Sequence, residues 1–320
     1  MTLEVGQPPA AAAATSLASQ VARLFFDRGM TKVEIAAHLG ISRFRVARLL
    51  DGALASGLVR IEYRDVPAED RTLATALEER FGLSLGAVAA TSDGVARLAG
   101  PVIDGLIGAT DVVGVAWGST LAAVVREIPS RPGSSVEVVQ LAGSSVRLGR
   151  GLDAGELARG LAERLGGAHR AIYAPAFVED AAVRSALLRE PEVAETVARF
   201  SSVDLAIVGI GAMPIEGREA ASSLLGSGVL DDTDVQRLAA AGAIGDLVVH
   251  PFDATGVFVA PDLAARAIAI GVDELRAVPR VVAVAYGTQK AAAIRGAMAT
   301  GLVQMLITDA ATARAILDRP

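Results

Sequence analysis

Residues 31–50 read TKVEIAAHLGISRFRVARLL, and this stretch decides how the first part of the chain folds. Thr31, followed three residues later by Glu34, forms a capping box, which predicts that a helix begins here. Gly40 permits the left-handed turn that ends a helix, and Ser42 is a favourable N-terminal cap for the next helix. The sequence therefore predicts two helices joined by a very short turn.

The apolar residues around this turn predict how the helices pack. Ala36 lies four residues before Gly40, and its small side chain lets two helices cross closely. A preceding helix that ends at Gly29 is predicted by the helical spacing of its apolar residues. The residues expected to form the shared core are Val21, Leu24 and Phe25, then Ile35, Ala36 and Leu39, then Val46, Leu49, Leu50 and Ala53. This arrangement predicts a helix-turn-helix domain.

A helix-turn-helix domain places the first turn of its last helix in the major groove of DNA. The residues expected to contact DNA are Thr31, Ser42, Arg43, Phe44, Arg45 and Arg48. After Gly57, residues 58–63 alternate between apolar and polar and predict a short wing strand. The bare pattern also fits an ordinary three-helix bundle with solvated arginines, and Arg48 alone fits a phosphate contact or a surface charge.

Charge is distributed unevenly along the chain, whose net charge is −6. Residues 15–65 carry 8 basic and 5 acidic side chains, a net charge of +3. The remainder carries 22 basic and 31 acidic side chains, a net charge of −9. A basic N-terminal segment attached to an acidic body is typical of a DNA-binding module joined to a sensor domain.

Composition excludes several classes of site. The 320 residues include no cysteine, so disulfides, thiolate metal sites and thiol catalysis are excluded. The three histidines, His38, His169 and His250, are far apart in sequence, and we expect neither a metal nor a cofactor. Residues 1–15 lack the basic start and apolar core of a signal peptide and are expected to be a disordered tail. No apolar run approaches the roughly 20 residues of a membrane span, so the protein is expected to be cytoplasmic.

From about Phe81 onward, apolar strands alternate with helices rich in alanine and leucine. This alternation predicts an α/β domain with a doubly wound, mostly parallel sheet. The predicted strands are residues 112–117, 136–141, 205–210, 247–249, 281–286 and 303–307. The helix expected over residues 68–81 would link the two domains and help to pair subunits.

Three of the predicted strands end in glycine-containing loops that suit an anion. The loops span residues 114–120, 208–212 and 284–290. The first and third share one form, in which a strand is followed by an aromatic residue, a glycine, a hydroxyl residue and a helix. Backbone N–H groups at a helix N-terminus favour a negative ligand, and the carboxyl ends of parallel strands lie at one edge of the sheet. Taken singly, each loop also fits an ordinary turn, in which Ser119 only caps its helix and Lys290 points into water. Trp117 and Tyr286 would then only pack.

Many short segments in a fixed order resemble the SorC family of bacterial transcriptional regulators, from about Ser16 to Leu317. The matching segments are residues 113–120, 138–143, 204–212, 242–246, 252–253, 286–290, 294–295 and 306–309. The resemblance implies a domain similar to sugar-phosphate isomerases such as ribose-5-phosphate isomerase and glucosamine-6-phosphate deaminase. It also implies a phosphorylated sugar or polyol as effector, a homodimer or homotetramer, and double-stranded operator DNA with an inverted repeat. The expected segments are then the tail 1–15, the DNA-binding domain 16–65, the linker helix 66–82 and the effector-binding domain 83–320.

The resemblance also assigns the effector site by position. The implied contacts are Gly118, Ser119 and Thr120 on the phosphate side, with Gly211, Ala212, Asp246, Asp253 and Lys290 forming the rest of the pocket. Three positions depart from the family pattern. Ser119 replaces a threonine, Tyr286 replaces a glycine and so narrows the expected pocket, and Ala47 replaces a serine of the DNA-binding helix. The identity of the effector is therefore not implied.

Two other functions compete with a regulator. A sugar-phosphate isomerase or deaminase with a DNA-binding appendage needs positioned acids, and the segment after the third strand has none before Glu216. The chain has no Walker A sequence, and Lys290 would form a Schiff base only if it were desolvated. A purely structural DNA-bridging protein would not need three loops suited to an anion. We therefore expect a regulator that is not an enzyme.

Overall fold

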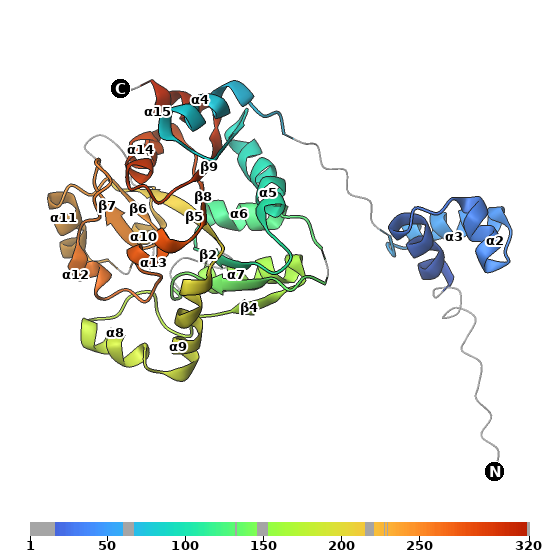
Figure 1. The fold of residues 1–320 in the computed structure, drawn as a ribbon, viewed down its shortest axis with the longest axis horizontal. Helices are drawn as coiled ribbons and strands as arrows, with labels where there is room; N and C mark the ends of the chain where they lie inside the picture. The colour runs from blue at the N-terminus through green and yellow to red at the C-terminus, as the bar shows by residue number, and fades with distance from the viewer. Residues whose placement is uncertain are drawn as a thin grey trace, which may run out of the picture. The chain divides into compact units, whose positions relative to one another are not determined.

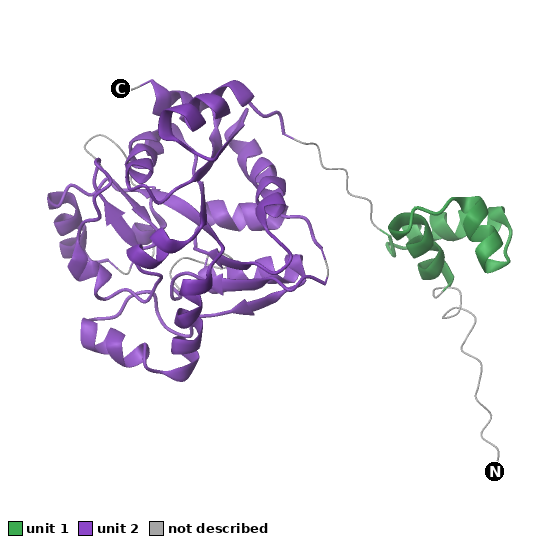
Figure 2. Cartoon of the chain, in the orientation of Figure 1, with its two compact units in different colours: residues 1–65 green, residues 66–320 purple. Residues whose placement is uncertain are grey.

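The computed structural model describes residues 17–59, 67–131, 133–145, 153–214, 221–226, 228 and 230–318. The chain divides into two compact units, residues 1–65 and residues 66–320 (Figure 2). The expected tail, residues 1–15, and most of the expected wing, residues 60–63, lie outside the described residues. No helix of the described part is both long and apolar enough to cross a membrane.

The smaller unit is built from three helical segments whose ends follow the sequence signals. Residues 17–22 are helical and continue into η1 (Arg23–Asp27), which precedes α2 (Lys32–Leu39) and α3 (Arg43–Ala55). The predicted capping box is present: the backbone N–H of Thr31 donates to Glu34 Oε2 (2.8 Å), and that of Glu34 donates to Thr31 Oγ1 (3.3 Å). Gly40 has a φ of +64° and ends α2, and Ser42 Oγ accepts from Arg45 N at 3.2 Å to cap α3. The helix boundaries predicted at these residues are confirmed.

One apolar cluster holds the smaller unit together. Its buried members are Val21, Leu24, Ile35, Val46 and Leu50, with Phe25, Ala36, Leu39 and Leu49 packed around them. These nine residues were expected from helical spacing, whereas Leu17, Met30 and Ile41, which also pack against the cluster, were not. Because this face of α3 points into the cluster, the opposite face of the helix is left in solvent.

In its described residues, the larger unit contains one parallel sheet of seven strands with a short antiparallel hairpin attached. The parallel strands stand in the order β1, β9, β8, β5, β2, β3 and β4. Their bounds are β1 (Leu85–Ala89), β2 (Val112–Val115), β3 (Glu137–Gln140), β4 (Ala168–Arg170), β5 (Leu205–Ala212), β8 (Arg280–Val284) and β9 (Met305–Asp309). The doubly wound, mostly parallel fold is confirmed. Neither β1 nor the short, exposed β4 was predicted.

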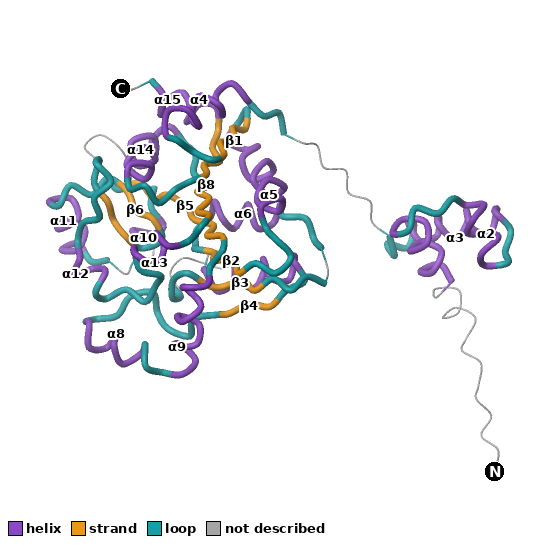
Figure 3. The backbone as a smooth tube through the Cα atoms, viewed as in Figure 1, coloured by secondary structure: helices purple, strands orange, loops and turns teal. Residues whose placement is uncertain are grey.

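Helices cover both faces of this sheet (Figure 1). Figure 3 views the sheet along its edge, with α5 (Val95–Leu106) and α6 (Ser119–Glu127) on one side and α14 (Ala291–Ala299) on the other. The other principal helices are α4 (Arg71–Phe81), α7 (Ala154–Leu165) and α15 (Ala310–Leu317). The remaining ones are η2 (Ser92–Gly94), α8 (Ala181–Leu187), α9 (Pro191–Ala198), η4 (Arg199–Ser202), α10 (Ser223–Gly226), α11 (Asp232–Ala240), α12 (Pro261–Ala264), α13 (Val272–Ala277) and η5 (Thr288–Lys290).

The helix expected over residues 68–81 is shorter than predicted and has a different role in packing. It begins at Arg71 because the Asp70 carboxylate accepts a hydrogen bond from Leu73 N (3.1 Å) and caps it. Ala74 and Leu77 are completely buried in the core of the larger unit, where α4 packs on β1 and α15. Its apolar face is therefore used within the subunit, and it does not offer that face for pairing subunits.

The hairpin of β6 (Gly245–Leu247) and β7 (His250–Phe252) corrects one predicted strand. Residues 247–249 were expected to be extended, but the chain reverses there, with Leu247 paired to His250. Val248 has a φ of +60°, a left-handed conformation that β-branched residues rarely adopt and that a tight turn requires. The hairpin lies antiparallel to the end of β5, so Asp246 is brought opposite Gly211.

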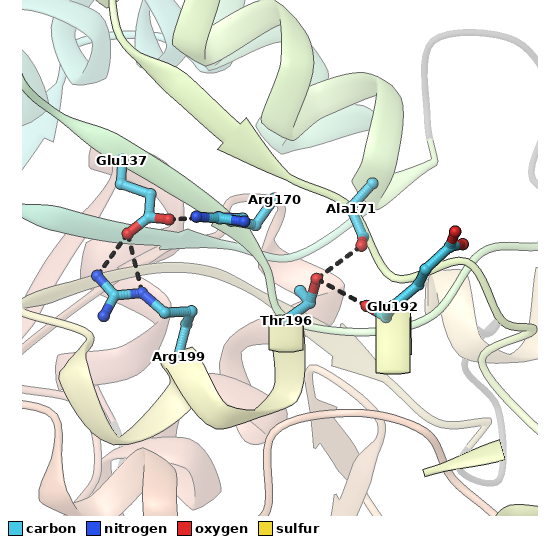
Figure 4. A network of polar contacts seen from close by, with 6 residues as sticks. All are labelled: Glu137, Arg170, Ala171, Glu192, Thr196 and Arg199. Carbon is cyan, nitrogen blue, oxygen red and sulfur yellow. Dashed lines mark hydrogen bonds and ion pairs between the residues drawn. The ribbon is translucent and has the colours of Figure 1, made fainter. Parts of the chain in front are cut away.

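An ion-pair cluster fixes the β4 edge of the sheet (Figure 4). Glu137 of β3 accepts hydrogen bonds from Arg170 Nε of β4 (2.6 Å) and from Arg199 Nε (2.9 Å). Burial opposes ionisation of Glu137, but the two arginines hold its pKa below the usual value. Thr196 Oγ1 on α9 donates to the Ala171 carbonyl at 2.9 Å. These contacts attach α9 and η4 to the strand edge, away from the loops that form the cavity described next.

Candidate functional site

A cavity of about 380 Å³ opens at the carboxyl ends of β2, β5 and β8. All three predicted glycine loops contribute to its lining, together with residues 221–223, Asp246 and Val248. Six of the eight residues expected in the effector site line it: Gly118, Ser119, Thr120, Gly211, Asp246 and Lys290. The fold therefore brings together segments that are more than 160 residues apart in sequence, as expected for the carboxyl edge of a parallel sheet.

The first loop follows β2 and leads directly into α6. Gly118 is the N-terminal cap residue of α6 and has a φ of +115°, and a Cβ atom there would lie only 2.8 Å from Ser223 Oγ. The positive φ favours glycine here, and a Cβ atom would in addition make the Ser223 hydroxyl shift. Among the described residues, no side chain caps α6, and Ser119 is its first residue rather than its cap. The first backbone N–H groups of α6 remain available at the cavity, where the helix dipole favours an anion.

The loop after β8 has the same form, in which a glycine with a positive φ precedes a helical segment. Gly287 has a φ of +101° and donates its N–H to Thr312 Oγ1 at 2.7 Å, and η5 and α14 follow. The Lys290 side chain turns inward, and its Nζ donates to the Ile210 carbonyl of β5 at 2.8 Å. Burial lowers the pKa of Lys290, and the negative charge of Asp246 opposes this shift. Lys290 is therefore a cavity residue, which excludes the alternative that it points into water.

The third side of the cavity is a carboxyl group held against a glycine. Ser222 Oγ donates to Asp246 Oδ1 at 2.6 Å. Burial raises the pKa of Asp246 to about 6, and the hydrogen bond from Ser222 and the charge of Lys290 partly oppose this shift. A Cβ atom on Gly211 would lie 1.9 Å from the same carboxylate oxygen, so only glycine fits beside it. The cavity thus combines a carboxyl, an ammonium, hydroxyls and helix N–H groups.

Two residues expected in the effector site lie elsewhere. Asp253 sits in an exposed turn after β7, where its carboxylate accepts hydrogen bonds from Thr255 Oγ1 (2.7 Å), Thr255 N (2.8 Å) and Val257 N (3.0 Å). These bonds lower the pKa of Asp253 and fix the turn. Ala212 is buried at the end of β5 and pairs with Ala221. Neither residue is part of the cavity lining.

Part of the cavity lining was not predicted as contact residues. Ser222, Ser223 and Val248 line the cavity but lie outside the three predicted loops, whereas Trp117, Tyr286 and Gln289 lie within them and were not named as contacts. Ser222 Oγ caps the short helix α10 by accepting from Leu224 N at 3.0 Å. A hydroxyl residue before a short helix is a weak signal for a cap, and it gives no indication of a site.

The described residues contain no cluster of three or more histidine, aspartate or glutamate side chains that could hold a metal ion. The polar groups of the cavity also differ from those of a metal site, because they mix donors with a single carboxyl. They suit an anionic, hydroxylated small molecule instead.

The expected DNA-contacting residues lie on the solvent side of the smaller unit. Ser42, Arg43, Phe44, Arg45 and Arg48 are all exposed on or just before α3. The Arg43 guanidinium lies over the Phe44 ring, 5.0 Å from its centroid. Thr31 is exposed too, but its hydroxyl is already engaged with Glu34.

Comparisons with known proteins agree with this architecture. The family described as "Putative sugar-binding domain" matches residues 66–318. The erythritol catabolism regulatory protein EryD of Brucella abortus is 30% identical over 318 residues, 95% of this chain and 97% of EryD. The sorbitol operon regulator of Klebsiella pneumoniae is 27% identical over 309 residues, 93% of this chain and 96% of that protein. The crystal structure of the full-length regulator SorC from that organism aligns with a TM-score of 0.72 and 25% identity, covering 94% of this chain and 98% of SorC.

The family match lies in the larger unit, whereas the matches to the two regulators and to the SorC structure cover 93–95% of the chain and so extend into the smaller unit. The family match covers more than half of the chain, and each relative named above is a regulator matched along nearly its whole length. The helix pair of the smaller unit and the parallel sheet of the larger one agree with that assignment. The chain belongs to the SorC family of sugar-binding transcriptional regulators.

Proposed function

We propose that this regulator binds operator DNA through α3 and that a phosphorylated sugar or polyol in the 380 Å³ cavity controls its affinity for that DNA. The observation that carries the proposal is that one cavity is lined by the Lys290 ammonium, the Asp246 carboxyl and the N-terminus of α6. Such a site is complementary to a molecule with an anionic end and a hydroxylated end. The names of SorC and EryD link those relatives to sorbitol and erythritol, which are polyols.

We assign the phosphate end to the N-terminus of α6 and to Lys290. Ser119 and Thr120 offer two hydroxyls and two backbone N–H groups there, and α6 has nine residues to contribute to the dipole. Lys290 gives one N–H to the Ile210 carbonyl, which leaves two for a phosphate oxygen. A bound anion would favour the charged lysine and so offset the effect of burial on its pKa.

We assign the hydroxyl end to Asp246 and Ser222. An ionised carboxylate is an acceptor only, and sugar hydroxyls are donors that it would bind. Trp117 and Tyr286 add apolar surface beside the polar groups, and Tyr286 stands where the family pattern has a glycine. The narrower cavity that results would favour a compact or open-chain ligand over a bulky one.

We further propose that the protein acts as a homodimer or homotetramer on an inverted repeat in double-stranded DNA. A single α3 presents few contacts, and tight specific binding needs two heads on half-sites about one helical turn, or a multiple of it, apart. Sedimentation of the protein alone and with its operator would test this. A monomer bound to DNA one to one would contradict it.

The effector proposal is tested by thermal unfolding against a panel of phosphorylated sugars and polyols, with the unphosphorylated compounds as controls. A ligand at 100 times its dissociation constant should stabilise the protein by about 2.7 kcal/mol. The same compounds are then added to the complex of the protein with operator DNA. A ligand that stabilises the protein but leaves DNA affinity unchanged, or that is converted to product, would contradict the proposal.

A further inference from the structure

Phe44 is exposed and is not part of the apolar cluster that holds the smaller unit together. It lies in the first turn of α3 and is 68% exposed, more than any other large apolar side chain in the described part of that unit. At about 100° per residue, the buried Val46, Leu50 and Ala53 lie about 180° to 240° around the helix from Phe44. The cap that fixes the start of α3 is made by Ser42, not by Phe44. An exposed phenylalanine on the outer face of a helix indicates a binding surface.

The charges around Phe44 indicate what kind of partner would cover it. Arg43 stacks on one face of the ring at 5.0 Å, and Arg45 and Arg48 are exposed within one turn. An apolar side chain among three cations is complementary to a polyanion that carries an apolar group. Asp51, seven residues and about 10 Å further along the same face, is exposed and would repel phosphates. The contact surface is therefore limited to the first two turns of α3.

Double-stranded DNA offers one prominent apolar group to a helix in its major groove, the C5 methyl of thymine. We propose that Phe44 reads a thymine methyl in each operator half-site and so determines sequence specificity at that position. The inference rests on the proposed DNA-binding function and adds to it the chemistry of one base contact. Arg43 stacked behind the ring fixes its orientation, while Arg45 and Arg48 remain available for phosphates or base edges.

The test removes the methyl group and the ring separately. Duplexes are first selected from a random library with the full-length wild-type protein in the absence of sugar phosphates. Each thymine of the selected half-sites is then replaced, one at a time, by deoxyuridine, which lacks only the methyl. Affinities are measured by fluorescence anisotropy at constant salt. At one position per half-site, the wild-type protein should bind the deoxyuridine duplex about four-fold more weakly, as expected from one apolar carbon of burial.

Phe44→Ala should bind thymine and deoxyuridine duplexes equally at that position, and Phe44→Leu should keep part of the preference. Leu54→Ala is the matched control, because Leu54 is 41% exposed on the same helix, about 15 Å from Phe44. That variant should keep the full preference. Selection of half-sites without thymine, indifference of the wild-type protein to every deoxyuridine, or a preference that survives in Phe44→Ala would each overturn the inference. Failure to select any duplex would instead contradict the proposed DNA binding.

Discussion

Replacing Lys290 with methionine is the sharpest test of where the phosphate binds. Methionine keeps most of the side-chain volume and removes the ammonium, which donates to the Ile210 carbonyl inside the cavity. A hydrogen bond from a charged group contributes about 1.5–3 kcal/mol. The affinity for a phosphorylated ligand should therefore fall by about 10- to 150-fold. Affinity for the unphosphorylated form of the same compound should change little, since Lys290 is assigned to the phosphate alone.

Loss of the lysine also costs stability, and the assay has to separate the two effects. The Ile210 carbonyl would lose its donor, which costs about 1–3 kcal/mol in a buried setting. Calorimetric titration of the folded variant with both forms of the ligand gives an affinity ratio that does not depend on this cost. Arg126→Met is the matched control, because Arg126 is exposed in the last turn of α6, at the opposite end from the cavity. It removes one positive charge from the same unit and should leave the ratio unchanged.

A second variant tests whether Lys290 acts together with α6. Thr120→Val removes the hydroxyl assigned to the same phosphate and should weaken the phosphorylated ligand by about 1 kcal/mol. Because both groups contact one anion, the two effects should be non-additive, by at least about 0.5 kcal/mol. Binding of operator DNA without effector should persist in both variants. If both respond normally to the effector, or lose only stability, the phosphate is bound elsewhere.

Three further predictions follow from the geometry. Burial raises the pKa of Asp246 to about 6, so the protonated form stabilises the fold relative to the ionised form. This stabilisation, about 3 kcal/mol, is lost as pH rises from about 4 to 6. Asp246→Asn should remove this pH dependence from thermal unfolding curves, and an unchanged pH profile would contradict the prediction. Gly211→Ala places a methyl 1.9 Å from the Asp246 carboxylate and should abolish effector binding, measured by calorimetry, while leaving DNA binding in place. Arg45→Ala should weaken operator binding by about 1–3 kcal/mol if Arg45 reads a base, whereas Arg189→Ala, which removes an exposed arginine of the larger unit, should not.

The sequence predicted the helix ends well because local chemistry determines them. Thr31 with Glu34, Gly40 and Ser42 each act within four residues, and all of them form the contacts expected of them. The predicted start of the helix over residues 68–81 was wrong because a local cap was overlooked. Asp70 is as good an N-terminal cap as Ser42, and it places the start of the helix at Arg71 instead of residue 68. A signal of this kind is available in the sequence wherever a cap residue precedes a helical pattern.

Strands were predicted less well, because their pairing depends on distant segments. Residues 247–249 are all apolar and two of them are β-branched valines, as in many strands, yet Val248 is forced to a φ of +60° by the hairpin between β6 and β7. The missed β4 has only three residues, all exposed, and exists because it pairs with β3. Neither tertiary effect leaves a local pattern in the sequence.

Placement of the site residues illustrates the same division between local and distant effects. Each glycine loop alone was compatible with an ordinary turn, but parallel strands carry their carboxyl ends to one edge, so the loops after β2, β5 and β8 had to meet. Asp246 joins them only because the hairpin folds back on β5 and pairs it with Gly211. Asp253 is also an aspartate and lies seven residues later, but its carboxylate accepts hydrogen bonds within its own turn. What separates the two aspartates is therefore the register of one antiparallel pairing, and a change in that register would move the carboxyl out of the cavity while leaving every loop motif intact.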